Sequence, residues 1–270
     1  MKNFLLKLFL IQFVLQNAHF HAYHFNTCDS SSNSYVLETL YGQIKGDCFK
    51  VPVSYSNGSK ISTSVLNWLS VPYAEPPINE NRFKNPIPKK AWPTIIDGTE
   101  WPKPCLQKFD PNGVEDCLYL NIFVRSDVYH NRNATLVPIL FFIHGGGLVS
   151  GTITTDYYEG STLASYAEIV VVTIQYRLDS LGFLHLTNSD ARGNQGFLDQ
   201  HLALKWVYEN ARQFGGDQTK ITLSGESAGA FAVGYHLMYE KSWPYFRNGI
   251  MESGGPSLKS ISPITSIEAN

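Results

Sequence analysis

Two apolar runs in the middle of the chain predict strands that are buried on both faces. Residues 137–143 and 169–176 consist mostly of apolar, largely β-branched side chains. A strand covered by helices on both faces needs such a run, whereas a half-exposed strand alternates apolar and polar positions. Residues 220–223 and 249–251 predict two further short strands of the same sheet.

Helical spacing of apolar residues appears between these strands. Within residues 194–214, Leu198, Leu202 and Trp206 recur at every fourth position and predict one apolar helix face. Four further side chains widen that face: Phe197, Val207, Ala211 and Phe214. Residues 228–239 predict a second helix. Alternating strands and helices are typical of an α/β fold, so we expect a mainly parallel central sheet with helices on both faces.

The part of the chain before this pattern predicts antiparallel strands. Residues 36–44, 49–55 and 61–71 are short β-favouring runs separated by turn residues, and Asn57-Gly58 favours a tight hairpin. Residues 72–104 contain many prolines and predict a loop, and residues 118–125 predict another strand. We therefore expect an N-terminal antiparallel β region ahead of the parallel sheet.

The first residues resemble a signal peptide. Lys2 and Lys7 flank the start of an apolar run over residues 4–15, and the small residues Ala18 and Ala22 follow it. A membrane anchor is the alternative, but the run is shorter than the roughly 20 residues of a spanning helix. We expect residues 1–22 to be a signal peptide cleaved near Ala18 or Ala22, residues 23–270 to form one domain region, and the protein to be secreted.

Composition narrows the possible partners. The chain has 270 residues, a formal net charge of −2, 43% hydrophobic and 16% charged residues, which is typical of a globular protein and gives no indication of a nucleic-acid partner. No later segment predicts a transmembrane helix. The sequons at Asn57 and Asn133 favour a secretory route with glycosylation.

Four cysteines allow three disulfide pairings, and none has the spacing of a metal site. A bridge between Cys105 and Cys117 would close a polar loop, and Cys28 and Cys48 would then form the remaining pair. Disulfides are the expected state of these cysteines in an oxidising compartment. We predict neither a metal site nor a cofactor.

A Gly-x-Ser-x-Gly motif, Gly225 to Gly229, lies between a predicted strand and a predicted helix. A sharp strand-to-helix turn holds the serine in strained geometry, and the glycines remove Cβ atoms that would clash there. The hydroxyl of Ser227 would project at a helix N-terminus, where the helix dipole favours a developing anion. An ordinary Gly/Ser loop is the alternative.

A second motif, His144-Gly145-Gly146-Gly147, directly follows a predicted buried strand. Glycines leave backbone N–H groups unshielded and let a substrate approach closely. These amides, with that of Ala228, could form an oxyanion hole. A loop that merely needs positive φ angles is the alternative, but it would not explain a serine elbow downstream.

These motifs together resemble the type-B carboxylesterase and cholinesterase family, which has the α/β-hydrolase fold. The similarity runs in family order from about residue 39 to 256 and covers about the first half of a family domain. It rests on the following matches: Phe214-Gly215-Gly216 with Ile221 to Gly229, Glu115 to Asn121, Pro72-Tyr73-Ala74 with Arg82-Phe83, Tyr176-Arg177, and Gly193 to Gly196 with Asp199-Gln200.

The resemblance implies roles for particular residues. Ser227 would be the nucleophile, and the N–H groups of Gly146, Gly147 and Ala228 would bind the oxyanion. Glu226 would either tune the field at the reacting centre or be only the variable residue of the motif. Three structural pairs are implied as well: a disulfide Cys105–Cys117 and the ion pairs Arg82–Glu115 and Arg177–Asp199.

The same resemblance implies that the acid and the histidine of the triad follow the nucleophile at a greater distance than the 43 residues after Ser227. None of the eight histidines is expected to be the base. We therefore expect these 270 residues to be an inactive fragment of a longer secreted esterase, with a sheet that ends after the strand following the nucleophile helix. A short secreted form that binds without turnover, and a non-catalytic binding or adhesion protein, are the alternatives.

Two departures from the family pattern concern the substrate. The interval between Cys105 and Cys117 contains Phe109 but no Trp, whereas cholinesterases use a Trp there to hold the choline cation. Leu148 stands where relatives commonly carry Phe. Choline selectivity is therefore doubtful, and the expected substrate is a small-molecule carboxylic ester.

Overall fold

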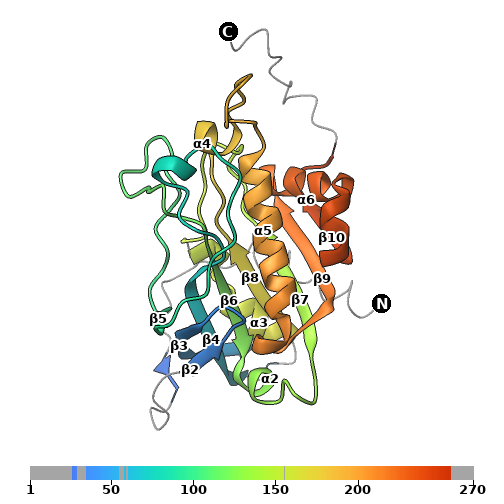
Figure 1. Ribbon diagram of the computed structural model, residues 1–270. Helices are drawn as coiled ribbons and strands as arrows, with labels where there is room; N and C mark the ends of the chain where they lie inside the picture. Colours follow the sequence, from blue (N-terminus) through green and yellow to red (C-terminus); the bar gives the residue numbers. More distant parts are fainter. Residues whose placement is uncertain (1–25, 29–34, 55–57, 59, 155, 257–270) are drawn as a thin grey trace.

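The computed structural model describes residues 26–28, 35–54, 58, 60–154 and 156–256 (Figure 1). The predicted signal peptide, the glycosylation site at Asn57 and the first half of the Asn57-Gly58 turn lie outside these residues. Among the described residues, no helix is long and apolar enough to cross a membrane.

One sheet of ten strands forms the centre of the described molecule. The strands are β1 (Asn26–Thr27), β2 (Tyr35–Glu38), β3 (Gln43–Ser54), β4 (Lys60–Pro72), β5 (Ile96–Asp97), β6 (Tyr119–Arg125), β7 (Val137–Ile143), β8 (Val170–Ile174), β9 (Gly216–Glu226) and β10 (Asn248–Glu252). Their order is β1-β3-β4-β6-β8-β7-β9-β10, and β2 and β5 pair with β3 outside this path.

The sheet is mixed, and its antiparallel strands precede the parallel ones along the chain, as the sequence predicts. Strands β3, β4, β6 and β8 pair antiparallel, whereas β8, β7, β9 and β10 pair parallel. The antiparallel strands are not a separate region, since β6 pairs directly with β8 and joins both halves. A continuous apolar run indicates burial on both faces and carries no information about strand direction, so it does not predict the antiparallel pairing of β8 with β6.

Helices cover both faces of the sheet, as expected. The α-helices are α2 (Ser126–His130), α3 (Ser161–Ala167), α4 (Asp179–Phe183), α5 (Gln195–Asn210) and α6 (Ala228–Met238). The described residues also form four short 3-10 helices: η1 (Asn79–Asn81), η2 (Asp156–Tyr158), η3 (Ala211–Phe214) and η4 (Glu240–Tyr245).

Strand alternation divides the core between the two faces. Ile122 of β6 belongs to the large cluster that also contains Trp206 of α5 and Val233 of α6. Its neighbour Phe123 points to the opposite face and packs in a smaller cluster with Ala164 of α3. Figure 1 shows α5 lying along the sheet. Each helix therefore buries its apolar side against alternate residues of the same strands.

Two boundaries differ from the sequence expectation. The predicted strand over residues 36–44 is broken by a turn in which the N–H of Thr39 donates to the carbonyl of Gly42 at 3.0 Å, and β3 then runs unbroken from Gln43 to Ser54. On α5, Leu198 and Leu202 are only half-buried, whereas Leu204 and Trp206 are fully buried. Helix α5 also contacts α4, α6 and η4, so more than one of its sides is covered.

Candidate active site

Ser227 occupies a sharp turn between β9 and α6. Its backbone has φ 55° and ψ −118°. Residues other than glycine rarely adopt this conformation, which costs about 1–3 kcal/mol. Glycines make this turn possible. A Cβ on Gly225 would lie 2.3 Å from the carbonyl of Gly229, and a Cβ on Gly229 would lie 2.1 Å from the carbonyl oxygen of Ile143. The motif is therefore a strained elbow and not an ordinary Gly/Ser loop.

Backbone hydrogen bonds hold this elbow from both sides. The N–H of Ser227 donates to the carbonyl of Glu252 in β10 at 2.8 Å, and its carbonyl accepts from the N–H of Phe231 in α6 at 3.1 Å. Ser227 is exposed although Gly225 and Ala228 on either side of the elbow are buried. Among the described residues, its hydroxyl makes no hydrogen bond. The elbow thus presents an unpaired hydroxyl to solvent.

The glycine run after β7 lies directly against this elbow. In the parallel pairing of β7 with β9, Ile143 lies opposite Gly225, so both strands end at the same edge of the sheet. A Cβ on Gly145 would lie 3.2 Å from the Cβ of Ser227 and 2.7 Å from the carbonyl oxygen of Glu226. The two motifs that the sequence singles out are therefore in contact.

Three backbone N–H groups of the glycine run and the elbow have no backbone acceptor among the described residues. Gly146 and Gly147 have φ angles of 108° and 65°, and within the described part of the chain neither N–H donates a backbone hydrogen bond. Ala228 is the first residue of α6, and the first N–H groups of a helix have no partner within it. Residues Gly146, Gly147 and Ala228 are those that the resemblance assigns to an oxyanion hole.

His144 supports the glycine run from inside the protein. Its ring stacks on Tyr176 with centroids 4.4 Å apart, its Nδ1 donates to the carbonyl of Gly145 at 2.8 Å, and Tyr176 donates to the His144 carbonyl at 2.9 Å. Burial lowers the pKa of His144 to about 4, so the ring is neutral at pH 7. These contacts indicate a structural role for His144.

The other described histidines are engaged elsewhere. His236 is buried and bonds to Ser242 Oγ at 2.9 Å and Gln200 Oε1 at 3.1 Å, and His201 Nδ1 contacts the same hydroxyl at 2.9 Å. His130 lies in α2 and His185 in the loop after α4. No histidine among the described residues hydrogen-bonds to Ser227.

Both ion pairs implied by the resemblance form. Arg177 donates through Nη2 and Nε to the two carboxylate oxygens of Asp199 at 2.7 and 2.8 Å, and both side chains are almost fully buried. Arg177 also donates to the carbonyl of Lys84 at 2.8 Å, which ties the proline-rich loop to α5. Arg82 Nε lies 2.6 Å from Glu115 Oε2 and remains half-exposed, so it contributes little stability.

Disulfides join Cys105 to Cys117 and Cys28 to Cys48. This is the pairing that the loop spacing favoured among the three possible ones. The first bridge joins cysteines 12 positions apart, and Gln107 in the loop that it closes donates to the carbonyl of Gly151. In addition, the loop contains Phe109, which is 91% exposed, with Lys108 Nζ 4.8 Å from the centre of its ring.

Glu226 directly precedes Ser227 and lies beside a second acidic residue, Glu252. It is partly buried, and in the parallel pairing of β9 with β10 it lies opposite Glu252. Burial is the main cause that raises the pKa of Glu252, and the charge of Glu226 adds to it. The same charge contributes, after burial, to the raised pKa of Tyr158. The charge of Glu226 thus acts on two neighbouring side chains, Glu252 and Tyr158.

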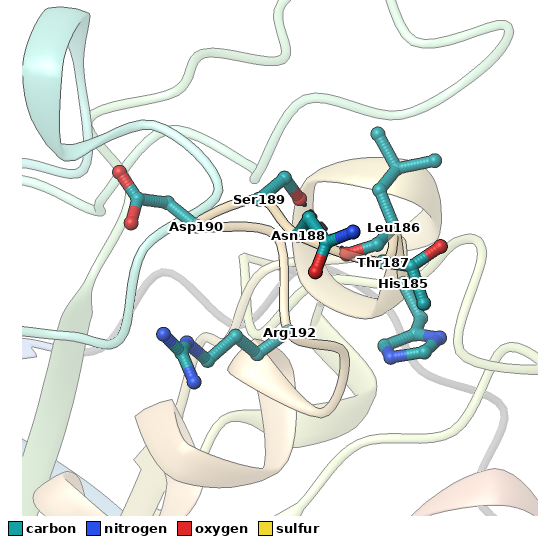
Figure 2. Close-up of a pocket in the computed structure, with 7 residues that line it drawn as sticks. All are labelled: His185, Leu186, Thr187, Asn188, Ser189, Asp190 and Arg192. Atoms are coloured by element: carbon teal, nitrogen blue, oxygen red, sulfur yellow. Dashed lines mark hydrogen bonds between the residues drawn. The ribbon is translucent and has the colours of Figure 1, made fainter.

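A hollow of about 840 Å³ lies beside the loop after α4 (Figure 2). Figure 2 shows Asp190 and Arg192 on one side of this loop and His185 on the other. None of the predicted site residues lines it. Among the described residues, no group of three or more His, Cys, Asp or Glu side chains could hold a metal ion.

Sequence reasoning missed two residues that contact the candidate site, Gln107 and the ring of Tyr176 against His144. Gln107 bonds to Gly151, 44 residues away, and belongs to no motif. In the sequence, Tyr176 stands out only as part of a family motif. The sequence contains no signal for either contact, because both depend on the tertiary arrangement of separate loops.

Comparison with known proteins agrees with this geometry. A model described as the carboxylesterase family matches residues 33–263. Acetylcholinesterase 1 of Caenorhabditis briggsae is 40% identical over 73% of this chain and 34% of its own length. Acetylcholinesterase of Electrophorus electricus is 39% identical over 82% of this chain and 36% of its own length. The pyrethroid hydrolase Ces2e of Rattus norvegicus is 38% identical over 87% of this chain and 42% of its own length. The chain thus spans about a third to two fifths of the length of these relatives. With a family model that covers most of its length, an exposed serine elbow and an adjoining glycine run, the chain belongs to the carboxylesterase family.

Proposed function

We propose that the protein is a secreted serine hydrolase of small-molecule carboxylic esters. The observation that carries this proposal is the contact between the Ser227 elbow and the glycine run with its free amides. Both parts of an acyl-transfer site, a strained serine and bare N–H donors, lie at the same sheet edge. A non-catalytic binding protein has no need of either part, so we do not favour that alternative.

The proposed reaction proceeds through an acyl-enzyme. Ser227 Oγ attacks the ester carbonyl carbon while a general base takes the hydroxyl proton. The negative charge that develops on the carbonyl oxygen is held by the N–H groups of Gly146, Gly147 and Ala228. The C–O bond to the alcohol breaks and the base returns the proton to the leaving oxygen. Water then attacks the acyl carbon, and Ser227 regains its proton as the carboxylic acid leaves.

The general base and its acid partner lie, in this proposal, outside the described residues. In α/β-hydrolases both follow the nucleophile along the chain. The histidines that the structure describes support this, since His144, His201 and His236 are held by other partners. We therefore propose that the 270 residues alone are inactive, because a serine without its base is a weak nucleophile.

Secretion is supported by two features besides the N-terminal sequence. The two disulfides are the expected state of these cysteines in an oxidising compartment. Asn133 lies exposed in the turn after α2, so its side chain is accessible for glycosylation. We propose glycosylation at Asn133 and at Asn57, and removal of residues 1–22.

Ester turnover by the full-length protein and its Ser227→Ala variant tests the proposal. We expect hydrolysis of p-nitrophenyl acetate by the unchanged protein and a loss of about 10⁶-fold in kcat in the variant. Matching thermal unfolding of the two proteins would show that the fold is unchanged. Equal turnover by both would contradict the assignment of Ser227.

A further inference from the structure

The side chain of Gln107 connects the disulfide loop to Gly151, four residues after the glycine run. The Gln107 Oε1 accepts from the N–H of Gly151 at 2.8 Å, and its Nε2 donates to the carbonyl of Gly151 at 2.9 Å. The same Nε2 also donates to the carbonyl of Cys105 at 3.1 Å. The carboxamide thus uses both its acceptor and its donors to fix one residue 44 positions away, in the manner of a strand pairing.

Gly151 links Gln107 to the glycine run because it is in direct contact with Gly145 and His144. Its φ is 113°, and a Cβ there would lie 2.4 Å from the carbonyl oxygen of Gly145 and 2.5 Å from His144 Nδ1. Gly151 therefore packs directly on the same two groups that form the hydrogen bond supporting Gly145. Gly145 in turn lies against Ser227.

The other end of the connection is anchored covalently. Gln107 lies two residues after Cys105, inside the loop closed by the disulfide to Cys117. Two backbone bonds fix the start of this loop: Leu106 N–H to the carbonyl of Val114 at 2.8 Å, and Val114 N–H to that of Pro104 at 2.9 Å. Gln107 therefore holds Gly151 from a rigid support.

We propose that Gln107 is a positioning residue for the oxyanion hole, acting through Gly151 and His144 on the amides of Gly146 and Gly147. This rests on the function proposed above. Donors must meet the oxyanion within a narrow range of distances, so a small displacement of the run lowers transition-state stabilisation more than substrate binding. Loss of Gln107 therefore acts on kcat and not on KM.

Gln107→Ala in the full-length protein is the first test. We expect kcat for p-nitrophenyl acetate to fall roughly 10- to 100-fold while KM changes less than about twofold. Gln218→Ala is the matched control, since Gln218 is also partly buried but lies near the start of β9, at the opposite end of that strand from Ser227. An unchanged kcat, or a loss confined to KM, would overturn the proposal.

Gln107→Glu separates positioning from a general loss of packing. As a carboxylate it would place negative charge against the carbonyls of Gly151 and Cys105, whereas its protonated form can again donate one hydrogen bond and accept another. We expect the ratio of its kcat to that of the unchanged protein to rise as pH falls from 8 to 5. A ratio that does not vary with pH would argue against the proposed contact.

Hydrogen exchange tests the positioning without any catalysis. We expect amides of the peptide covering residues 144–151 to exchange faster in Gln107→Ala than in the unchanged protein or in Gln218→Ala. Unchanged exchange would overturn the proposal even if kcat fell. If the unchanged protein showed no turnover dependent on Ser227, the proposed function would fail while this exchange experiment still decided the role of Gln107.

Discussion

At the scale of single residues, close contacts explain why the elbow accepts glycine alone at two positions. Gly225 and Gly229 face backbone atoms, which cannot move aside as a flexible side chain can. Ser227 carries the strain that this turn imposes, and its position is fixed by hydrogen bonds to β10 and α6. A serine in any less constrained loop would not face the glycine run in one defined orientation.

Gly229→Ala should therefore damage both the fold and the site. The new Cβ would meet the carbonyl oxygen of Ile143 at 2.1 Å, so α6 must shift away from β7. We expect the free energy of unfolding to fall by about 3 kcal/mol, measured by denaturant unfolding. Gly255→Ala is the control, since a Cβ there has no neighbour within 4 Å. Equal stability of both variants would contradict this account of the elbow.

Glu226 offers a second test at this scale. A carboxylate beside Ser227 opposes the negative charge of the oxyanion but attracts cationic substrates. We expect Glu226→Gln to lower kcat/KM for acetylthiocholine more than for the neutral ester phenyl acetate, and to weaken the dependence of the former on salt. Equal effects on the two esters would mean that Glu226 is only the variable residue of its motif.

At the scale of elements, the middle of α5 and the last turn of α6 meet η4 around two histidines. His236 of α6 bonds to Gln200 of α5 and to Ser242 of η4, which His201 of α5 also contacts. Burial, and after it the neighbouring His201, lowers the pKa of His236 from 6.5 to about 3. The cluster is therefore stable only while His236 is neutral.

This cluster makes stability depend on pH in a predictable direction. Below pH 6.5 the unfolded chain binds a proton at His236 that the folded protein does not, so unfolding becomes more favourable as pH falls toward 3. We expect the free energy of unfolding to drop between pH 7 and pH 5 by about 2 kcal/mol more in the unchanged protein than in His236→Gln.

Denaturant unfolding at several pH values measures this difference. The matched control is His130→Gln, because His130 is exposed in α2. If His236→Gln lost as much stability on acidification as the unchanged protein, the buried neutral histidine would not be the cause.

The sequence predicts where strands and helices lie better than it predicts how the strands pair. The apolar run at residues 137–143 is confirmed as β7, with the same bounds, because burial on both faces leaves a direct pattern. The direction of a strand and the identity of its neighbours leave no pattern in the sequence, so the antiparallel pairing of β6 with β8 cannot be predicted from it. At the site, Ser227 and the glycine run have motifs, whereas Gln107 acts through a contact that only the folded chain creates.

At the scale of the whole molecule, the mixed sheet brings the site together. The parallel strands β7, β9 and β10 end at one edge, so the residues that follow them meet there although they are distant in sequence. Ile143 lies opposite Gly225, and Glu226 opposite Glu252. The antiparallel strands extend the sheet and bury its centre. Ligands of open α/β sheets bind at this carboxyl edge.

The central claim is that Ser227 is an activated nucleophile in the assembled protein. The direct measurement is labelling of the full-length protein with diisopropyl fluorophosphate, followed by peptide mass spectrometry. Our account predicts one phosphoryl adduct, located on Ser227 and absent from Ser227→Ala. A folded full-length protein that takes up no label, or takes it up at another residue, would contradict it.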